Sequence, residues 1–200
     1  MDSMYGSELL DIGPASVYIP QNLGSGGTVG TGANDRLFMG GVDKVTLRGE
    51  VTATDLVYAQ AGVVNQFYSR PMAMVEFALA QATLERWEAM KPGFTFRKTG
   101  TGPSATITGG LWHGAAFKRA SDFMTPVQIV KLVGLENDSD DPLDSTILWK
   151  VAFNPNFELT FDESTQRFVG AVGRAFPDKT KKDADGNATF FGFGTFDLLA

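Results

Sequence analysis

Apolar and polar residues alternate along several short segments of the chain. Residues 44–52 are K-V-T-L-R-G-E-V-T, and residues 157–161 are F-E-L-T-F. Alternation with a period of two is typical of a strand with one buried face and one wet face. The same alternation recurs at residues 73–79 and 147–153. The pattern predicts an all-β protein, with antiparallel sheets in a β-sandwich or barrel-like arrangement around one shared core.

Further strands are expected where similar runs end at proline, glycine or polar turns. The first follows Pro14 and stops at Pro20. Short loops join consecutive strands in the second half of the chain, so that half is expected to form a meander, and no internal repeat is visible. The predicted strands are residues 15–19, 45–52, 55–60, 72–79, 127–135, 146–153, 157–161, 167–176 and 189–198.

One segment has the period of a helix. Residues 80–90 place Ala80, Leu84, Trp87 and Met90 three or four positions apart, on a single apolar stripe. Pro92 and Gly93 then end the helix. We expect one short α-helix that seals an open edge or end of the sheets, with Trp87 in the core.

The chain is predicted to be a single domain, residues 1–200, with three extensions that have few large side chains to bury. Residues 1–13 are expected to be a flexible N-terminal arm and residues 22–34 a glycine-rich loop. That loop matches neither of the phosphate-binding glycine motifs. Residues 94–108 are predicted to form a hairpin around K-T-G-T-G-P-S, which needs support from its own domain or from a neighbour. Residues 109–122 have no clear periodicity.

Composition excludes several kinds of chemistry. The chain has no cysteine, so disulfides, thiolate metal sites and a cysteine nucleophile are absent. A net charge of −6 argues against a protein that binds nucleic acid tightly, because such binding depends on lysine and arginine. No apolar run approaches the ~20 residues of a membrane span, and acids stand near the N-terminus where a secretory peptide has lysines. A soluble protein made in the cytoplasm is expected.

Candidate catalytic chemistry is sparse. His113 is the only histidine, and no nucleophile turn accompanies it. The acidic loop 136–144 could hold a hard cation, form a solvated turn or face a polyanion. Its carboxylates are Glu136, Asp138, Asp140, Asp141 and Asp144. The segment 183–187 is explained by a tight Asp-Gly turn. No catalytic, cofactor-binding or metal-binding residue is predicted, and the protein is not expected to be an enzyme.

Three segments taken in order resemble the phage tail tube protein (major tail protein) family of long-tailed phages. They are the S-V-Y-I strand before the glycine-rich loop, V-D-K-V-T-L at residues 42–47, and M-V-E-F-A-L-A-Q-A-T-L-E-R-W at residues 74–87. The third, in which a strand continues directly into the short helix, is the most specific.

The resemblance implies a structural virion protein without cofactors. It would form hexameric rings that stack into a tail tube, with residues 94–108 and 24–34 reaching an adjacent ring and residues 179–187 on the outside. Its implied partners are further copies of itself and the tape-measure, tail terminator and distal tail proteins. DNA would pass through the lumen in transient, non-specific contact, repelled by the acidic charge. The implied location is the virion tail, assembled in the host cytoplasm.

Two alternatives remain open. Another head–tail or capsid decoration component would form a single ring or a trimer instead of a stacking polymer. A carbohydrate-binding β-sandwich would need an exposed aromatic stacking surface, for which Trp112 or Trp149 is the candidate.

Overall fold

In the computed structural model, strands dominate the described part of the chain. The structure describes residues 9–11, 14–21, 35–42, 44–58, 62–79, 84–90, 92–100, 106–114, 119–133, 137–156 and 169–194. Among these residues the one α-helix is α1 (Leu84–Met90). All strand pairs are antiparallel. The prediction of an all-β antiparallel fold with one short helix is confirmed.

Ten strands of the described residues belong to one sheet, whose main path is β1-β4-β5-β11-β10-β8-β2-β3. β14 is attached to β10 and β9 to β8. The bounds of these strands are β1 (Leu9–Asp11), β2 (Ala15–Pro20), β3 (Arg36–Val42), β4 (Val45–Tyr58), β5 (Gly62–Leu79), β8 (Thr125–Val133), β9 (Asn137–Asp138), β10 (Ser145–Phe153), β11 (Val169–Ala175) and β14 (Phe191–Phe193). Two small hairpins are separate from this large sheet. One pairs β6 (Phe94–Thr99) with β7 (Thr106–Trp112), and the other pairs β12 (Asp178–Lys182) with β13 (Ala188–Thr189).

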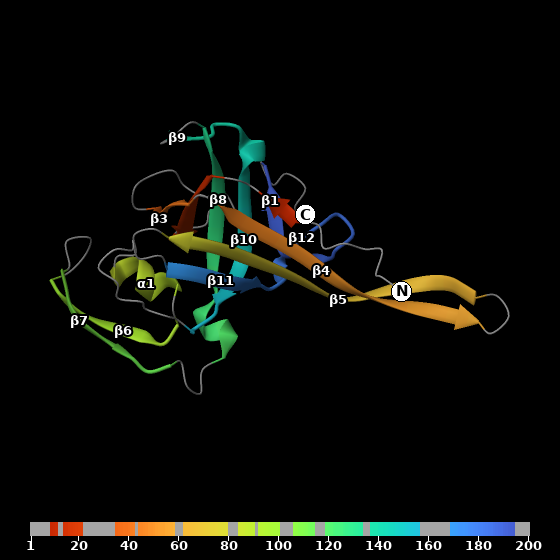
Figure 1. The fold of residues 1–200 in the computed structure, drawn as a ribbon, viewed down its shortest axis with the longest axis horizontal. Helices are drawn as coiled ribbons and strands as arrows, with labels where there is room; N and C mark the ends of the chain where they lie inside the picture. Colours follow the sequence, from red (N-terminus) through yellow and green to blue (C-terminus); the bar gives the residue numbers. More distant parts are fainter. Residues whose placement is uncertain are drawn as a thin grey trace, which may run out of the picture.

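The large sheet folds over on itself. In Figure 1, β8 and β10 cross the direction of β4, β5 and β11 at a steep angle. β3, at one end of the path, lies against β5. Strong twist lets one continuous antiparallel sheet enclose a core in this way, as two packed sheets would.

The alternating segments provide that core. Ala73, Val75, Phe77 and Leu79 are all buried, and so are Ile147, Trp149, Val151 and Phe153 on β10. The buried positions of β5 and β10 fall where the alternation predicted them. In these two segments at least one face of the strand lies against the core, and this is why apolar residues recur at every second position.

Helix α1 closes one side of the core through Trp87 and Met90, both buried. The Trp87 ring meets the Phe94 ring edge-on at 5.4 Å between centroids. Gly93 follows the helix with a φ of 95°, a conformation that glycine adopts without strain. The core position predicted for Trp87 is confirmed, and residues 80–83 of the predicted helix lie outside the described residues.

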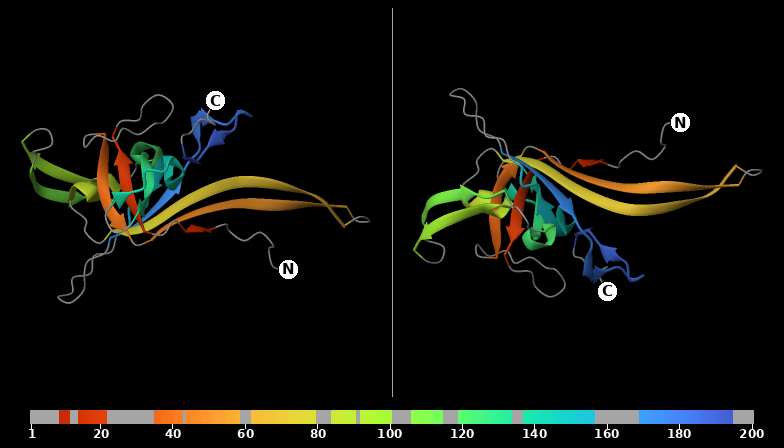
Figure 2. Two further views of the ribbon diagram at one scale, coloured as in Figure 1. Left: turned by 90° about the horizontal axis from the view of Figure 1, so that it is seen from above. Right: turned by 90° about the horizontal axis from the view of Figure 1, so that it is seen from below.

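The prediction for residues 45–79 is wrong in one respect. Two strands at 45–52 and 55–60 and a third from 72 were expected, whereas β4 is 14 residues long and β5 is 18. They pair from Val45↔Phe77 out to Tyr58↔Gly62, with a register irregularity between Glu50 and Thr52. Figure 2 shows the far half of this hairpin extending well beyond the rest of the molecule. Beyond Glu50 neither face has a core to cover, so alternation no longer marks the strands.

Two expected extensions also need correction. Residues 9–11, within the segment expected to be a flexible arm, pair with β4 as β1. The β6–β7 hairpin is confirmed, but it continues to Trp112 and its arms do have something to bury. Phe94 and Phe96 pack against the core cluster, so the hairpin is supported by its own domain. The glycine-rich loop 22–34 and the strand expected at 157–161 lie outside the described residues.

Candidate interaction surface

The far half of β4–β5, residues 51–58 and 62–69, is here called the projecting hairpin. Asp55 is the only charged residue between Val51 and Ser69 in the sequence. Four large apolar side chains are nevertheless exposed on it: Val51 56%, Leu56 37%, Phe67 57% and Tyr68 57%. Solvent-exposed ribbons are ordinarily protected by charges, so a nearly uncharged one is a candidate interaction surface.

Both edges of the projecting hairpin are open within the described residues. β1 pairs with β4 only at Thr46–Arg48, and β11 pairs with β5 only at Ala73–Leu79. Unpaired backbone N–H and C=O groups on a long strand are a template for pairing with a further strand. A two-stranded ribbon is also marginal by itself. The open edges are therefore a second feature that makes the projecting hairpin a candidate interaction surface.

The two faces of the projecting hairpin differ. The register Ala53↔Tyr68 and Asp55↔Gln66 places these four residues on one face. On this face the Tyr68 hydroxyl donates to Gln66 Oε1 at 3.2 Å, and Gln66 Nε2 donates to Asp55 Oδ1 at 2.7 Å. The opposite face carries uncharged residues only. They are Thr52, Thr54, Leu56, Asn65, Phe67 and Ser69.

The two tryptophans considered as sugar platforms have different environments. Trp149 is 3% exposed, and its indole Nε1 donates to the Thr189 hydroxyl at 3.2 Å. The hypothesis of a Trp149 stacking surface is therefore wrong, because its face is inside the core. Trp112 is half exposed at the end of β7, with its ring tilted against Phe94 at 6.5 Å.

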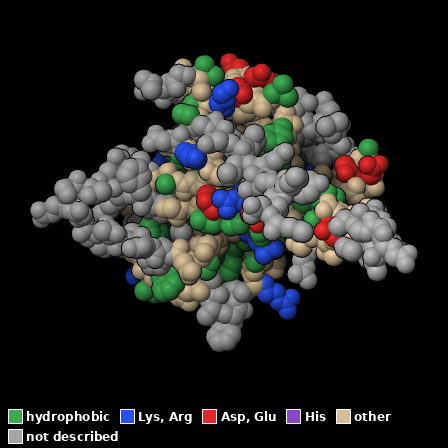
Figure 3. Space-filling model, turned by 45° about the vertical axis from the view of Figure 1, so that its right-hand side comes forward, with side chains coloured by type: hydrophobic (Ala, Val, Ile, Leu, Met, Phe, Trp, Pro, Cys, Tyr) green, Lys and Arg blue, Asp and Glu red, His purple; other side chains and the backbone are tan. Residues whose placement is uncertain are grey.

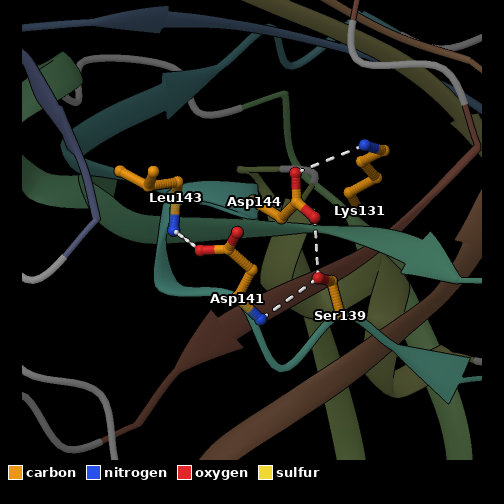
Figure 4. Close-up of polar contacts among 5 residues, drawn as sticks. All are labelled: Lys131, Ser139, Asp141, Leu143 and Asp144. Atoms are coloured by element: carbon orange, nitrogen blue, oxygen red, sulfur yellow. Dashed lines mark hydrogen bonds and ion pairs between the residues drawn. The ribbon is translucent and has the colours of Figure 1, made fainter.

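The described part of the acidic loop uses its carboxylates internally (Figure 4). Asp144 accepts from the Ser139 hydroxyl at 2.7 Å and from Lys131 Nζ at 3.4 Å, and Asp141 accepts from the Leu143 amide at 2.9 Å. The Ser139 hydrogen bond lowers the pKa of Asp144. These contacts support the interpretation of a structured, solvated turn.

Asp138, from the same loop, faces away toward β2. It accepts from the Tyr18 hydroxyl at 2.7 Å and lies 3.6 Å from Arg36. Asp138 therefore points away from the contacts that Asp141 and Asp144 make within the described part of the loop. Among the described residues no group of three His, Asp or Glu side chains is placed to hold a metal ion.

The other two segments considered for chemistry make local hydrogen bonds. In the Asp183 turn, Asp183 Oδ1 accepts from the amides of Asp185 and Asn187, and Gly186 has a φ of 83°. The hydrogen bond from the backbone N–H of Asn187 is the main cause of the lowered pKa of Asp183. His113 is exposed, and its amide donates to the Gly93 carbonyl.

An open pocket of ≈ 200 Å³ lies beside Phe123 and Phe153, and Arg119 is the one ionisable side chain among the described residues that line it. On the face drawn in Figure 3, charged side chains of both signs are scattered among apolar and polar ones. Neither feature assembles a nucleophile, a base and an oxyanion site. The projecting hairpin is therefore the feature of the described chain that most needs a functional explanation.

Sequence comparisons do not add a relative: no family model matches the chain, and no curated protein matches it. Within the described residues, no helix has the length and apolar character needed to cross a membrane.

Proposed function

We propose that the protein is the tail tube subunit of a long-tailed phage, a structural virion component that assembles into stacked rings around a lumen. The observation that carries the proposal is the projecting hairpin, a long ribbon with open edges, exposed apolar side chains and a single charge. Such a ribbon is unfavourable in a monomer and is completed when a neighbour covers it. The hexameric ring and the tube follow from the sequence resemblance.

A comparison of free energies favours an association that includes strand pairing over one that depends on side-chain docking alone. Full burial of a Val, Leu, Phe or Tyr side chain contributes roughly 1.5–3 kcal/mol, so covering the four half-exposed side chains contributes about 3–6 kcal/mol in total. Association itself costs at least about 4 kcal/mol in lost freedom of motion. A stable contact therefore also needs the backbone hydrogen bonds of the open edges, which a ring provides for every copy.

The remaining partners follow from the same proposal. A tube needs a tape-measure protein during assembly, a tail terminator at one end and distal tail proteins at the other. DNA passes through the lumen in transient contact. The net charge of −6 supports passage without retention, because phosphates are repelled and not bound. The site of action in this proposal is the virion tail.

Truncation of the hairpin tests the proposal. Residues 53–68 are replaced by Asn-Gly, which turns the chain directly from Thr52 to its paired residue Ser69 and so keeps the register of the core part of β4–β5. We expect the intact protein to form rings or tubes by negative-stain microscopy and light scattering, and the truncated protein to stay folded and monomeric. Val133→Lys, at an exposed position on β8, is the matched control and should assemble normally.

The outcomes separate the alternatives. An intact protein that stays monomeric at high concentration contradicts the proposal. A single closed ring or a trimer indicates a head–tail or capsid decoration component instead. The half-exposed Trp112 favours carbohydrate binding as the second candidate, and glycan-array binding that is lost in Trp112→Ala would support it.

A further inference from the structure

The projecting hairpin and the β6–β7 hairpin lie at opposite ends of the molecule's long axis. In Figures 1 and 2 the projecting hairpin extends from one end, and β6–β7 stands at the other. Both are two-stranded, and both have at least one surface that the described chain does not cover. A molecule with unlike surfaces at its two ends associates head to tail, which generates rings or open filaments.

The outer face of β6–β7 is formed by Thr95, Arg97, Gly109 and Leu111. The register Thr95↔Leu111 and Arg97↔Gly109 puts these four on one side, while Phe94 and Phe96 turn to the core cluster on the other. Leu111 is 76% exposed. Arg97 is its diagonal neighbour across the two strands, and it makes no ion pair with the residues that the structure describes.

The two glycines of β7 differ in a way that also points to the outer face. A Cβ at Gly110 would lie 2.6 Å from the Phe96 ring, so internal packing requires a glycine there. A Cβ at Gly109 would meet nothing within 4 Å. Gly109 stands at the register shift between Arg97 and Lys98, where glycine is common, and its lack of a side chain also leaves the outer face open to close approach by another chain.

One face of the projecting hairpin has the complementary arrangement. Tyr68 and Asp55 are diagonal neighbours on it, as Leu111 and Arg97 are on β6–β7. Each face thus has a large apolar side chain beside a charge, and the charges are opposite. Gln66 links Tyr68 and Asp55 by hydrogen bonds, so the acid is held in place before docking.

We infer that the outer face of β6–β7 in one copy is the docking site for the Tyr68–Asp55 face of the projecting hairpin of the next copy. Tyr68 packs on Leu111, Asp55 pairs with Arg97, and Gly109 lets the two backbones approach. The inference rests on the proposed function, because it adds one face-to-face contact to the edge pairing through which the copies are proposed to assemble.

A charge exchange tests the pairing. Asp55→Lys and Arg97→Glu should each weaken self-association about fivefold or more, measured by sedimentation as an apparent Kd, because each places like charges together. The double variant should recover to within about threefold of the original protein. Lys179→Glu, at an exposed position on β12, is the control for net charge. Independent, additive losses in the double variant would overturn the inference.

Site-specific crosslinking provides a second readout. The chain has no cysteine, so Ala53→Cys in one tagged copy and Thr95→Cys in another give thiols at the two docking faces only. A short bis-maleimide reagent should link the two differently tagged chains, and Val133→Cys in place of Thr95→Cys should not. If the protein assembles but shows neither this crosslink nor the effect of the charge exchange on self-association, the hairpin docks elsewhere. That result overturns the inference and leaves the proposed function standing. A protein that never assembles overturns both.

Discussion

Gly173 on β11 shows how little space the core leaves beside a strand. A Cβ at this position would lie 2.5 Å from Val151 Cγ1 and 3.1 Å from the Phe153 ring, and both side chains are buried. Gly173→Ala should therefore lower the free energy of unfolding by about 1–3 kcal/mol. Urea denaturation followed by fluorescence measures it. Gly170→Ala on the same strand meets nothing within 4 Å and should stay within about 0.5 kcal/mol of the original protein. Equal losses would contradict the close packing.

Asp178 gives the molecule an acid-sensitive contact. Burial alone would raise the pKa of Asp178, but hydrogen bonds from Lys150 at 2.8 Å and from the Thr180 amide and hydroxyl outweigh it and lower the pKa. A lowered pKa stabilises the fold above the unfolded value of about 3.9, and this contribution is lost as pH falls through the folded value.

Asp178→Asn should therefore reduce Tm at pH 7, since a hydrogen bond to a charged group contributes about 1.5–3 kcal/mol. The difference in Tm between the two proteins should shrink as pH falls below about 4. Thermal melts from neutral to acidic pH measure it. A difference that stays constant down to about pH 2.5, well below the unfolded pKa, would show that the charge of Asp178 is not what stabilises β12.

At the scale of elements, α1 is what attaches the β6–β7 hairpin to the core. Trp87 is buried between the sheet and Phe94, so Trp87→Ala should cost about 3–5 kcal/mol of stability and loosen the hairpin. Limited proteolysis within β6–β7 reports that loosening. The half-exposed Trp112 is the matched control, because Trp112→Ala removes less buried surface and should cost clearly less. Equal cost at both positions would refute α1 as the attachment.

Elements that border the core could be predicted from the sequence. Residues 73–79 and 147–153 alternate because one of their faces is buried, and Trp87 lies on the apolar stripe of a helix. The projecting hairpin was missed because it has no core face to impose a period on its side chains. The signal that could have found it is composition: Asp55 is the only charge from Val51 to Ser69, among many β-branched and aromatic residues. Its open edges could not be predicted, since they depend on where β1 and β11 stop pairing.

At the scale of the whole molecule, charge opposes the assembly that the hairpins favour. Two copies of net charge −6 whose centres are about 30 Å apart repel by ~5 kcal/mol in salt-free water. Screening reduces this repulsion to ~2 kcal/mol at about 0.01 M salt and to a few tenths of a kcal/mol at about 0.1 M. The proposed pair of Asp55 in one copy with Arg97 in the next, exposed at the surface, would contribute only about 0.2–1 kcal/mol, and salt would weaken it too.

Repulsion between the copies outweighs the Asp55–Arg97 attraction at low salt, so assembly should strengthen as the salt concentration rises from about 0.01 M to about 0.15 M. Light scattering across a salt series measures this change. Assembly that weakens steadily over the same range would show that charge pairing, and not burial of the uncharged hairpin, holds the copies together.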